Sequence, residues 1–139
     1  MWTSWMSNFD ASLIEMDGDL YPSVEHAFQA AKVPRAERGR FLEARTPGQA
    51  KRLGRQVHLP TWWEEKKVGI MLELVRRKFT PGTALAHLLV DTGDEPLEEV
   101  NTWGDRFWGT VNGVGENWMG KLLMQVRAEL KEETWTPMS

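Results

Sequence analysis

The 139-residue chain contains no cysteine. Disulfide bonds and thiolate metal sites are therefore excluded, and nothing in the composition calls for an oxidising compartment. The three histidines, His26, His58 and His87, are scattered along the chain with no pair at the spacing of metal ligands. We therefore expect neither a metal site nor a cofactor.

The sequence also lacks an excess of positive charge and a long apolar run. Charged residues make up 27% of the chain and the formal net charge is −3, so broad electrostatic binding to nucleic acid is not expected. Any contact with DNA or RNA should be local. No run approaches the length of a membrane span, and residues 2–10 lack the basic start and continuous apolar core of a signal peptide. These absences predict a cytoplasmic protein that does not bind membranes.

No repeat, linker or low-complexity segment divides the chain, and its length is close to that of a typical domain, so we expect one domain over residues 1–139. An Asp17-Gly18 turn between short apolar pieces predicts a β-hairpin. Capping residues and apolar residues at helical spacing predict further elements. These are helices near residues 37–45, 46–54, 61–79 and 84–90, a helix starting at Asn117, and a brief strand over residues 97–100. The predicted fold class is α+β, predominantly helical, with a small N-terminal β-hairpin.

A short predicted helix carries three polar side chains on one face. Ser23 is a favourable N-cap, and Pro34 cannot continue the helix. At roughly 100° per residue, Glu25, Gln29 and Lys32 fall within about 60° of one another, beside an apolar stripe. Glu25 and Lys32 are about 10 Å apart along the axis, which leaves room for a ligand between them. The alternative is that this acid and this base only complement the helix dipole.

A second informative segment, residues 101–109, combines two tryptophans, a phenylalanine, an aspartate, an arginine and two glycines. It has neither helical nor alternating periodicity and therefore predicts an ordered loop. The indoles of Trp103 and Trp108 could stack on a planar heterocycle, and Asp105 could bind a ribose hydroxyl or move a proton. Alternatively, the aromatic residues anchor a core, and Asp105 pairs with Arg106 or caps a turn.

Residues 115–121 match the front of a phosphate-binding Walker A motif, but the match does not extend further. The next residue, Leu122, has no hydroxyl for magnesium, and no pattern of a parallel strand precedes the motif. We therefore expect no P-loop. The N-terminus of the helix at Asn117 could still receive a phosphate from its free backbone amides.

In this order, the motifs resemble the NADAR, or YbiA-like, N-glycosidase family. The resemblance runs from near the start of the chain almost to its end, and Met6 and Met119 stand where the family usually has leucine. The matching segments are Met6-Ser7-Asn8-Phe9, residues 21–32, residues 46–51, Trp63 with Lys67 and Met71, Lys78-Phe79, Leu88-Leu89, residues 92–94, residues 103–109, Gly115-Glu116-Asn117, residues 120–124 and Arg127.

The resemblance implies cleavage of the N-glycosidic bond that joins ribose to a nitrogen of a heterocycle. Two kinds of substrate are implied: ADP-ribosyl-guanine, whose cleavage would reverse a modification of DNA or RNA, and ribosylamino-pyrimidine intermediates of riboflavin synthesis. The expected partner is therefore a small-molecule nucleotide or ribosylamine, or ADP-ribosylated nucleic acid.

The mechanism implied by the resemblance uses a lysine that forms a Schiff base with the ring-opened sugar, a role that falls on Lys32. Burial beside Phe28 and Ala31 would lower the pKa of this lysine and favour the neutral amine. Glu25 would act as general acid and base, and Asp105 would orient ribose hydroxyls or share the proton transfer. The expected substrate-binding residues are Asn8, Phe9, Gln29, Trp103, Trp108 and Asn117.

Three alternatives remain open from the sequence. Glu25 and Asp105 could act as a carboxylate pair without a lysine adduct. The same pocket could belong to a non-catalytic module that binds ADP-ribose or a nucleotide. A plain interaction domain would tolerate Lys32→Ala without losing a partner.

Overall fold

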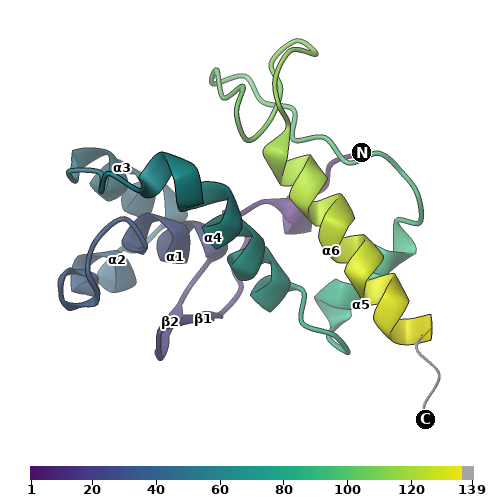
Figure 1. The fold of residues 1–139 in the computed structure, drawn as a ribbon, viewed down its shortest axis with the longest axis horizontal. Coiled ribbons are helices and arrows are strands. Elements are labelled where there is room, and N and C mark those ends of the chain that lie inside the picture. The colour runs from purple at the N-terminus through teal and green to yellow at the C-terminus, as the bar shows by residue number, and fades with distance from the viewer. Residues whose placement is uncertain (136–139) are drawn as a thin grey trace. The chain divides into compact units, whose positions relative to one another are not determined.

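A computed structural model describes the backbone of residues 1–135 and the side chains of residues 1–132 (Figure 1). Within this range the fold has six α-helices and one two-stranded antiparallel sheet, which confirms the predicted α+β class. The chain forms two compact units: the hairpin unit, Ser7–Lys78, and the terminal unit, in which Met1–Met6 joins the residues from Phe79 onwards. The single domain expected over residues 1–139 stays a prediction.

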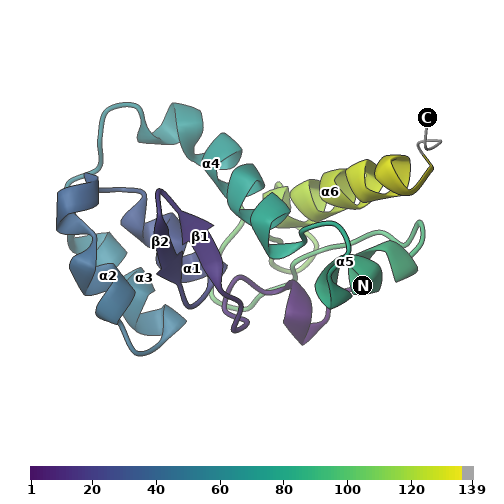
Figure 2. The same cartoon turned by 90° about the horizontal axis from the view of Figure 1, so that it is seen from below.

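The predicted β-hairpin opens the hairpin unit and is confirmed. Strand β1, Ile14–Met16, pairs with β2, Asp19–Tyr21, and Ile14 lies opposite Tyr21 (Figure 2). Asp17 and Gly18 form the turn, with φ angles of 52° and 88°. Glycine and aspartate tolerate this left-handed conformation, and such turns match the twist of a hairpin.

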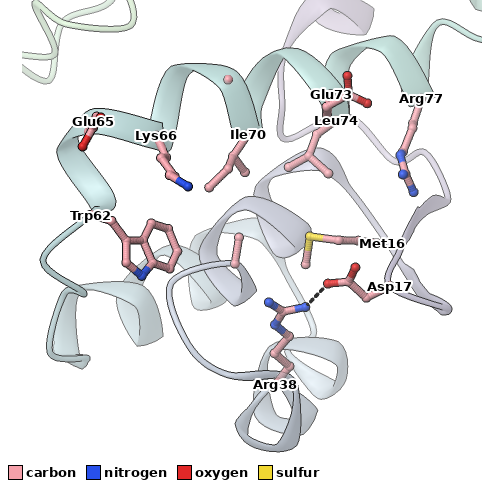
Figure 3. Close-up of a pocket in the computed structure, with 12 residues that line it drawn as sticks. Met16, Asp17, Arg38, Trp62, Glu65, Lys66, Ile70, Glu73, Leu74 and Arg77 are labelled. Atoms are coloured by element: carbon pink, nitrogen blue, oxygen red, sulfur yellow. Dashed lines mark hydrogen bonds and ion pairs between the residues drawn. The ribbon is translucent and has the colours of Figure 1, made fainter.

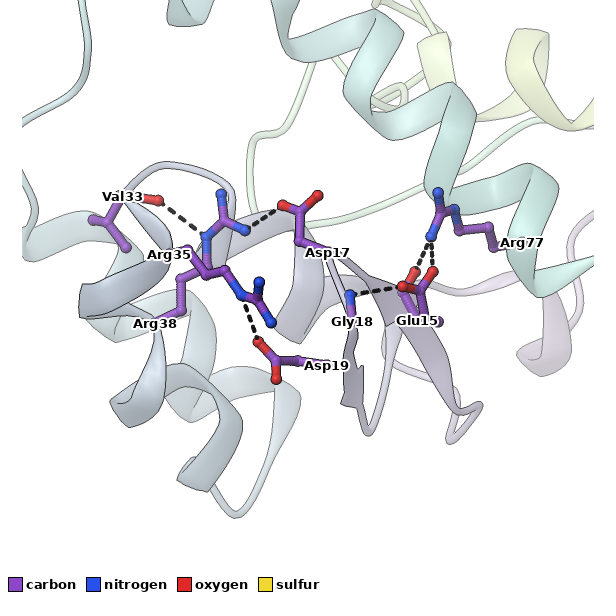
Figure 4. A network of polar contacts seen from close by, with 8 residues as sticks. All are labelled: Glu15, Asp17, Gly18, Asp19, Val33, Arg35, Arg38 and Arg77. Atoms are coloured by element: carbon purple, nitrogen blue, oxygen red, sulfur yellow. Dashed lines mark hydrogen bonds and ion pairs between the residues drawn. The ribbon is translucent and has the colours of Figure 1, made fainter.

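Ion pairs tie the hairpin to the helices around it (Figure 4). The Arg38 guanidinium donates to the Asp17 carboxylate at 2.6 Å and to the Val33 carbonyl at 3.0 Å. On the other side of the hairpin, Arg77 pairs with Glu15. Exposed pairs of this kind contribute little stability one by one, so their main effect is to orient the hairpin and its flanking side chains.

Helix α1, Val24–Ala30, lies at the centre of the hairpin unit, and all of its residues are buried. Ser23 caps it as predicted, because its hydroxyl accepts a hydrogen bond from the His26 amide at 3.1 Å. The helix ends before Lys32, whose amide bonds instead to the carbonyl three residues earlier. The predicted extension to residue 32 is therefore wrong. A residue that precedes proline avoids the helical region, so the chain leaves the helix ahead of Pro34.

Four further helical elements complete the hairpin unit. The predicted helix over residues 37–45 is split, because a 3₁₀ turn precedes a shorter helix. The helix predicted to start at Thr46 is confirmed, with the threonine hydroxyl accepting the Gln49 amide at 3.0 Å. The elements are the 3₁₀ turn Arg35–Glu37, α2 at Gly39–Glu43, α3 at Pro47–Gln56 and α4 at Trp63–Lys78.

The terminal unit contains the 3₁₀ turn Ser4–Met6, helix α5 at Ala84–Asp91 and helix α6 at Trp118–Trp135. Apolar side chains of α5 and α6 form its core. The strand predicted over residues 97–100 is wrong: Val100 makes only an isolated bridge. Instead of pairing with another strand, this segment bonds to the Asn117 side chain, which accepts from the Glu99 amide at 3.0 Å and donates to the Leu97 carbonyl at 2.9 Å. None of the helices in the described part of the chain is both long and apolar enough to cross a membrane.

Candidate functional site

Helix α1 brings an acid and an amide together inside the hairpin unit. Glu25 is only 7% exposed, and the Gln29 side chain donates a hydrogen bond to its carboxylate at 2.8 Å. The Glu25 amide in turn donates to the Asn8 carbonyl at 3.1 Å. A buried carboxylate needs such partners because desolvation penalises its charge. The predicted proximity of Glu25 and Gln29 is therefore present, and their shared bond fixes the orientation of the carboxylate.

The Lys32 amine lies just beyond the end of α1 and is half-buried. Its Nζ is 3.4 Å from the Gly54 carbonyl and 5.7 Å from the centre of the Trp63 ring. Burial lowers the pKa of Lys32 below its ordinary value, and the Glu25 carboxylate opposes that shift. Three neighbouring cations lower the pKa further: Arg55, Lys67 and Lys51. This environment favours a neutral, nucleophilic amine within the electrostatic reach of an acid.

Trp63 and Gly54 were not singled out as site residues from the sequence. Gly54 of α3 packs directly on Gln29, whose Oε1 is buried and has no hydrogen-bond partner in the described part of the chain. An unpaired buried carbonyl oxygen is costly, and at a candidate site it is an acceptor that a ligand can use. The position of Trp63 in the resemblance was a signal that could have identified it, whereas nothing local to Gly54 indicates its contact.

The Ser-Asn-Phe segment contacts the same unit from a different side. The Asn8 side chain is buried and donates to the Met71 sulfur at 3.6 Å, whereas Phe9 is 45% exposed with the Lys51 amine 5.9 Å from its ring centre. The Lys78 amine donates to the Ser7 carbonyl at 2.7 Å. Sequence reasoning gave Lys78 no role, yet this buried amine holds the segment that contacts the Glu25 backbone.

Lys32 lines a cavity of about 590 Å³ formed by the end of α1, the Arg38–Arg40 region and residues 56–62. Its lining includes His58 and Trp62. Glu25 is not among the lining residues, so the acid lies behind the amine within the hairpin unit. The cavity size is typical of small-molecule sites.

A neighbouring cavity of about 560 Å³ lies between α4 and the hairpin (Figure 3). Ile70 and Leu74 of α4 point toward Met16, and the Asp17–Arg38 ion pair lies at the edge. Neither Glu25 nor Lys32 lines it. Because it lacks both reactive groups, we assign the candidate chemistry to the cavity that contains the lysine.

In the terminal unit, Asp105 organises the tryptophan-rich loop. Its carboxylate accepts hydrogen bonds from the backbone amides of Phe107 at 3.0 Å and Trp108 at 2.9 Å. Asn101 fixes the Asp105 backbone through two further bonds, one to its amide and one from the Asn101 side chain to its carbonyl. The turn-capping interpretation of Asp105 therefore describes what it does within this unit, and a catalytic role would come in addition.

The same loop closes the N-terminus of α6. The amides of Trp118 and Met119 donate to the Phe107 and Trp108 carbonyls at 3.1 and 2.9 Å, and the Asn117 amide donates to a loop carbonyl at 3.3 Å. These amides are therefore not free to receive a phosphate, and the phosphate site suggested at this helix start is wrong. Both polar atoms of the Asn117 side chain are also hydrogen-bonded within the protein.

The two tryptophans predicted to stack on a substrate differ in exposure. Trp103 is 65% exposed, whereas Trp108 packs edge-on against Phe107 with 4.8 Å between ring centres. Both belong to the terminal unit, as do Asp105 and Asn117, whereas Glu25 and Lys32 belong to the hairpin unit. The common pocket for these two groups stays a prediction. Among the described residues, no three potential ligands from His, Cys, Asp and Glu gather around a metal position.

Comparison with known proteins gives consistent matches. The family model of the NADAR domain matches residues 1–131. N-glycosidase YbiA of Escherichia coli K12 is 37% identical over 131 residues, covering 91% of this chain and 81% of that protein. A riboflavin biosynthesis protein of Vibrio vulnificus is 38% identical over 134 residues, but the alignment spans only 36% of that longer protein. The NMR structure of E. coli YbiA superposes with a TM-score of 0.85 at 34% identity, covering 97% of this chain and 82% of that one.

Proposed function

This chain belongs to the NADAR family, and we propose that it hydrolyses an N-glycosidic bond between ribose and a nitrogen attached to a heterocyclic base. The proposed substrates are ADP-ribosyl-guanine, free or in nucleic acid, and ribosylamino-pyrimidine intermediates of riboflavin synthesis. The names of its relatives, N-glycosidase and riboflavin biosynthesis protein, support this class of reaction.

The observation that carries the proposal is the environment of Lys32. Its amine lies in a cavity wall near Trp63, has a pKa lowered by burial, and interacts electrostatically with the buried Glu25. Lysine nucleophiles that attack carbonyl carbons need this kind of desolvated setting, because only the neutral amine has a free electron pair. A lysine that served solubility alone would extend into water.

The reaction uses the ring-opened substrate, in which the ribose C1′ is doubly bonded to the base nitrogen. The Lys32 amine adds to C1′, and the bond between C1′ and the base nitrogen breaks as that nitrogen takes up a proton and leaves as an amine. Lysine and sugar are then joined by an imine. Water adds to C1′, the C–N bond to Lys32 breaks, and the sugar leaves as an aldehyde with the lysine regenerated.

Glu25 is the proposed proton carrier for these steps. The Gln29 bond orients its carboxylate, and the carboxylate can donate a proton to the leaving nitrogen and recover one from water. Asp105 is proposed to share this work or to bind ribose hydroxyls. Substrate binding is assigned to Asn8, Phe9, Gln29, Trp103, Trp108 and Asn117, to which we add Trp63.

Two substrates offered in parallel test the proposal: an oligonucleotide with ADP-ribosylated guanine and a ribosylamino pyrimidine. Base release is followed by mass spectrometry, and borohydride added during turnover reduces the imine. We expect release from at least one substrate and a sugar trapped on Lys32. Lys32→Ala should abolish both signals, and the exposed Lys66→Ala on α4 is the matched control.

Other outcomes separate the alternatives. Base release without any trapped sugar, and without loss in Lys32→Ala, would leave the carboxylate pair of Glu25 and Asp105. Failure to release base from both substrates, together with retained binding of ADP-ribose, would replace the enzyme by the non-catalytic binding module.

A further inference from the structure

The cavity beside Lys32 is more positively charged than the protein as a whole. The chain has a formal net charge of −3, yet Lys32, Arg38 and Arg40 all line this cavity. Glu37 is the one acidic residue among its lining residues in the described part of the chain. His58 adds an imidazole that can donate a hydrogen bond. A concave surface with such a local excess of cations attracts anions.

The basic side chains of this cavity differ in their availability. Arg38 is engaged by the Asp17 carboxylate and a backbone carbonyl. The Arg40 guanidinium lies 5.3 Å from the ring centre of the next residue, Phe41, and it makes no ion pair with any described carboxylate. His58 is exposed and has no hydrogen-bond partner within residues 1–132. Arg40 and His58 are therefore the groups that a ligand can recruit.

The reactive amine and these two groups line one cavity of about 590 Å³, large enough for a ribosyl group with its substituents. If the sugar's C1′ is at the Lys32 amine, the rest of the sugar must occupy the space beside it. Trp62, 41% exposed, offers an apolar surface to that space. The end of the sugar remote from C1′ is the end that carries a 5′ substituent.

We propose that this cavity binds a phosphate ester at the 5′ end of the ribosyl substrate, with Arg40 and His58 as the residues that determine this specificity. The inference rests on the proposed function, because it takes C1′ to be at Lys32. A guanidinium can donate two parallel hydrogen bonds to phosphate oxygens, and the imidazole can donate a third. A ribosyl group without phosphate would leave both side chains in water and gain none of these bonds.

Ribose 5-phosphate and ribose are the probes, since neither requires knowledge of the base. The open-chain aldehyde condenses with the Lys32 amine, releasing water, and borohydride reduces the resulting C=N bond to a stable amine. We expect the protein to trap ribose 5-phosphate at least about tenfold more efficiently than ribose, as charge-assisted hydrogen bonds of this strength imply. The double variant Arg40→Gln/His58→Gln should lose this preference, whereas the exposed Arg52→Gln on α3 should keep it.

Equal trapping of the two sugars by the unmodified protein would overturn the phosphate site and leave the Schiff-base proposal intact. If neither sugar is trapped, calorimetric titration with ribose 5-phosphate and with ribose decides. Binding that requires the phosphate and is lost in the double variant supports the site, even though the lysine chemistry has failed. Absence of phosphate-dependent binding overturns it. The single variants Arg40→Gln and His58→Gln repeat the measurement should the double variant fail to fold.

Discussion

Gly54 of α3 lies so close to Gln29 of α1 that a Cβ atom on the glycine would come within 1.8 Å of the Gln29 side-chain oxygen. The same glycine offers its carbonyl to the Lys32 amine. One backbone position therefore contacts both the residue that orients Glu25 and the proposed nucleophile. A larger side chain there must push Gln29 away from the carboxylate it holds.

Gly54→Ala is expected to destabilise the protein by about 1–3 kcal/mol and to lower kcat by at least about tenfold, because overpacking displaces Gln29 and frees the Glu25 carboxylate. Urea unfolding and base-release kinetics measure the two effects. Gly48→Ala in the same helix is the matched control, since its Cβ would meet only the Thr46 hydroxyl at 3.9 Å.

The double variant Gly54→Ala/Gln29→Ala tests the cause of this loss. Removing the glutamine side chain removes the clash, so the stabilities of the two single variants should not add. Strict additivity would show that Gly54 acts through something other than its contact with Gln29.

The second prediction concerns the pH dependence of the lysine. Because burial holds the pKa of Lys32 below its usual value of 10.5, the rate of borohydride trapping should rise with pH and level off below 10.5. Arg55 is one of the cations that lower this pKa. Arg55→Gln should therefore move the rising limb to higher pH by a few tenths of a unit.

Arg52→Gln, on the same helix but without this effect on Lys32, should leave the limb where it is. A limb that moves equally in both variants would indicate a general effect of charge on substrate approach. Repeating the profile at high salt separates the two causes, because screening suppresses long-range attraction more than a short-range shift.

Asp105 separates folding from catalysis in the third prediction. Asp105→Asn keeps an oxygen that can accept the Phe107 and Trp108 amides, so its stability should stay close to that of the unmodified protein. Asp105→Ala loses both bonds and should cost about 1–3 kcal/mol. If Asp105 moves a proton, both variants should lose activity by at least about tenfold.

Thermal unfolding and base-release assays on the same preparations give the comparison. Full activity in Asp105→Asn would restrict this aspartate to capping the loop. Arg106→Gln, at the adjacent position, controls for a change of charge in the loop.

The fourth prediction concerns stability and pH at Lys78. Burial lowers the pKa of Lys78 to about 8 in the folded protein, against an ordinary value of 10.5, and Asp10 opposes the shift. Between these two values the unfolded chain holds a proton that the folded protein has lost, so folding becomes more favourable as pH rises. The stability of the unmodified protein relative to Lys78→Met should increase through this window by up to about 1.4 kcal/mol per pH unit.

Denaturant unfolding of both proteins at a series of pH values measures this difference. The exposed Lys66→Met on the same helix should show no comparable pH-dependent change relative to the unmodified protein. A flat difference between Lys78→Met and the unmodified protein from pH 8 to 10.5 would contradict the burial of the charge.

Local features of the fold were predictable because they depend on a few adjacent residues. Asp17-Gly18 specifies the hairpin turn, and Ser23 and Thr46 specify helix starts, through bonds that span three residues. The brief strand over residues 97–100 failed for the opposite reason, since a side chain from residue 117 takes over its backbone bonds.

The candidate site was predictable only in its most recognisable parts. The polar face of α1 and the family resemblance identified Glu25, Gln29 and Lys32. The bond from Lys78 to the Ser7 carbonyl joins residues 71 positions apart, and the Gly54–Gln29 contact depends on how two helices pack. No periodicity or capping pattern encodes such contacts, because they arise from tertiary packing.

The loop carbonyls that occupy the amides at the start of α6 have a consequence for how an anion can be held. A helix start offers a fixed dipole that salt screens little when it is buried, but this one is already satisfied. Recognition of phosphate by Arg40 and His58, which are exposed, instead relies on charges immersed in electrolyte. Affinity for a phosphorylated ligand should then weaken as ionic strength rises, making the protein's selectivity a property of its medium as well as of its fold.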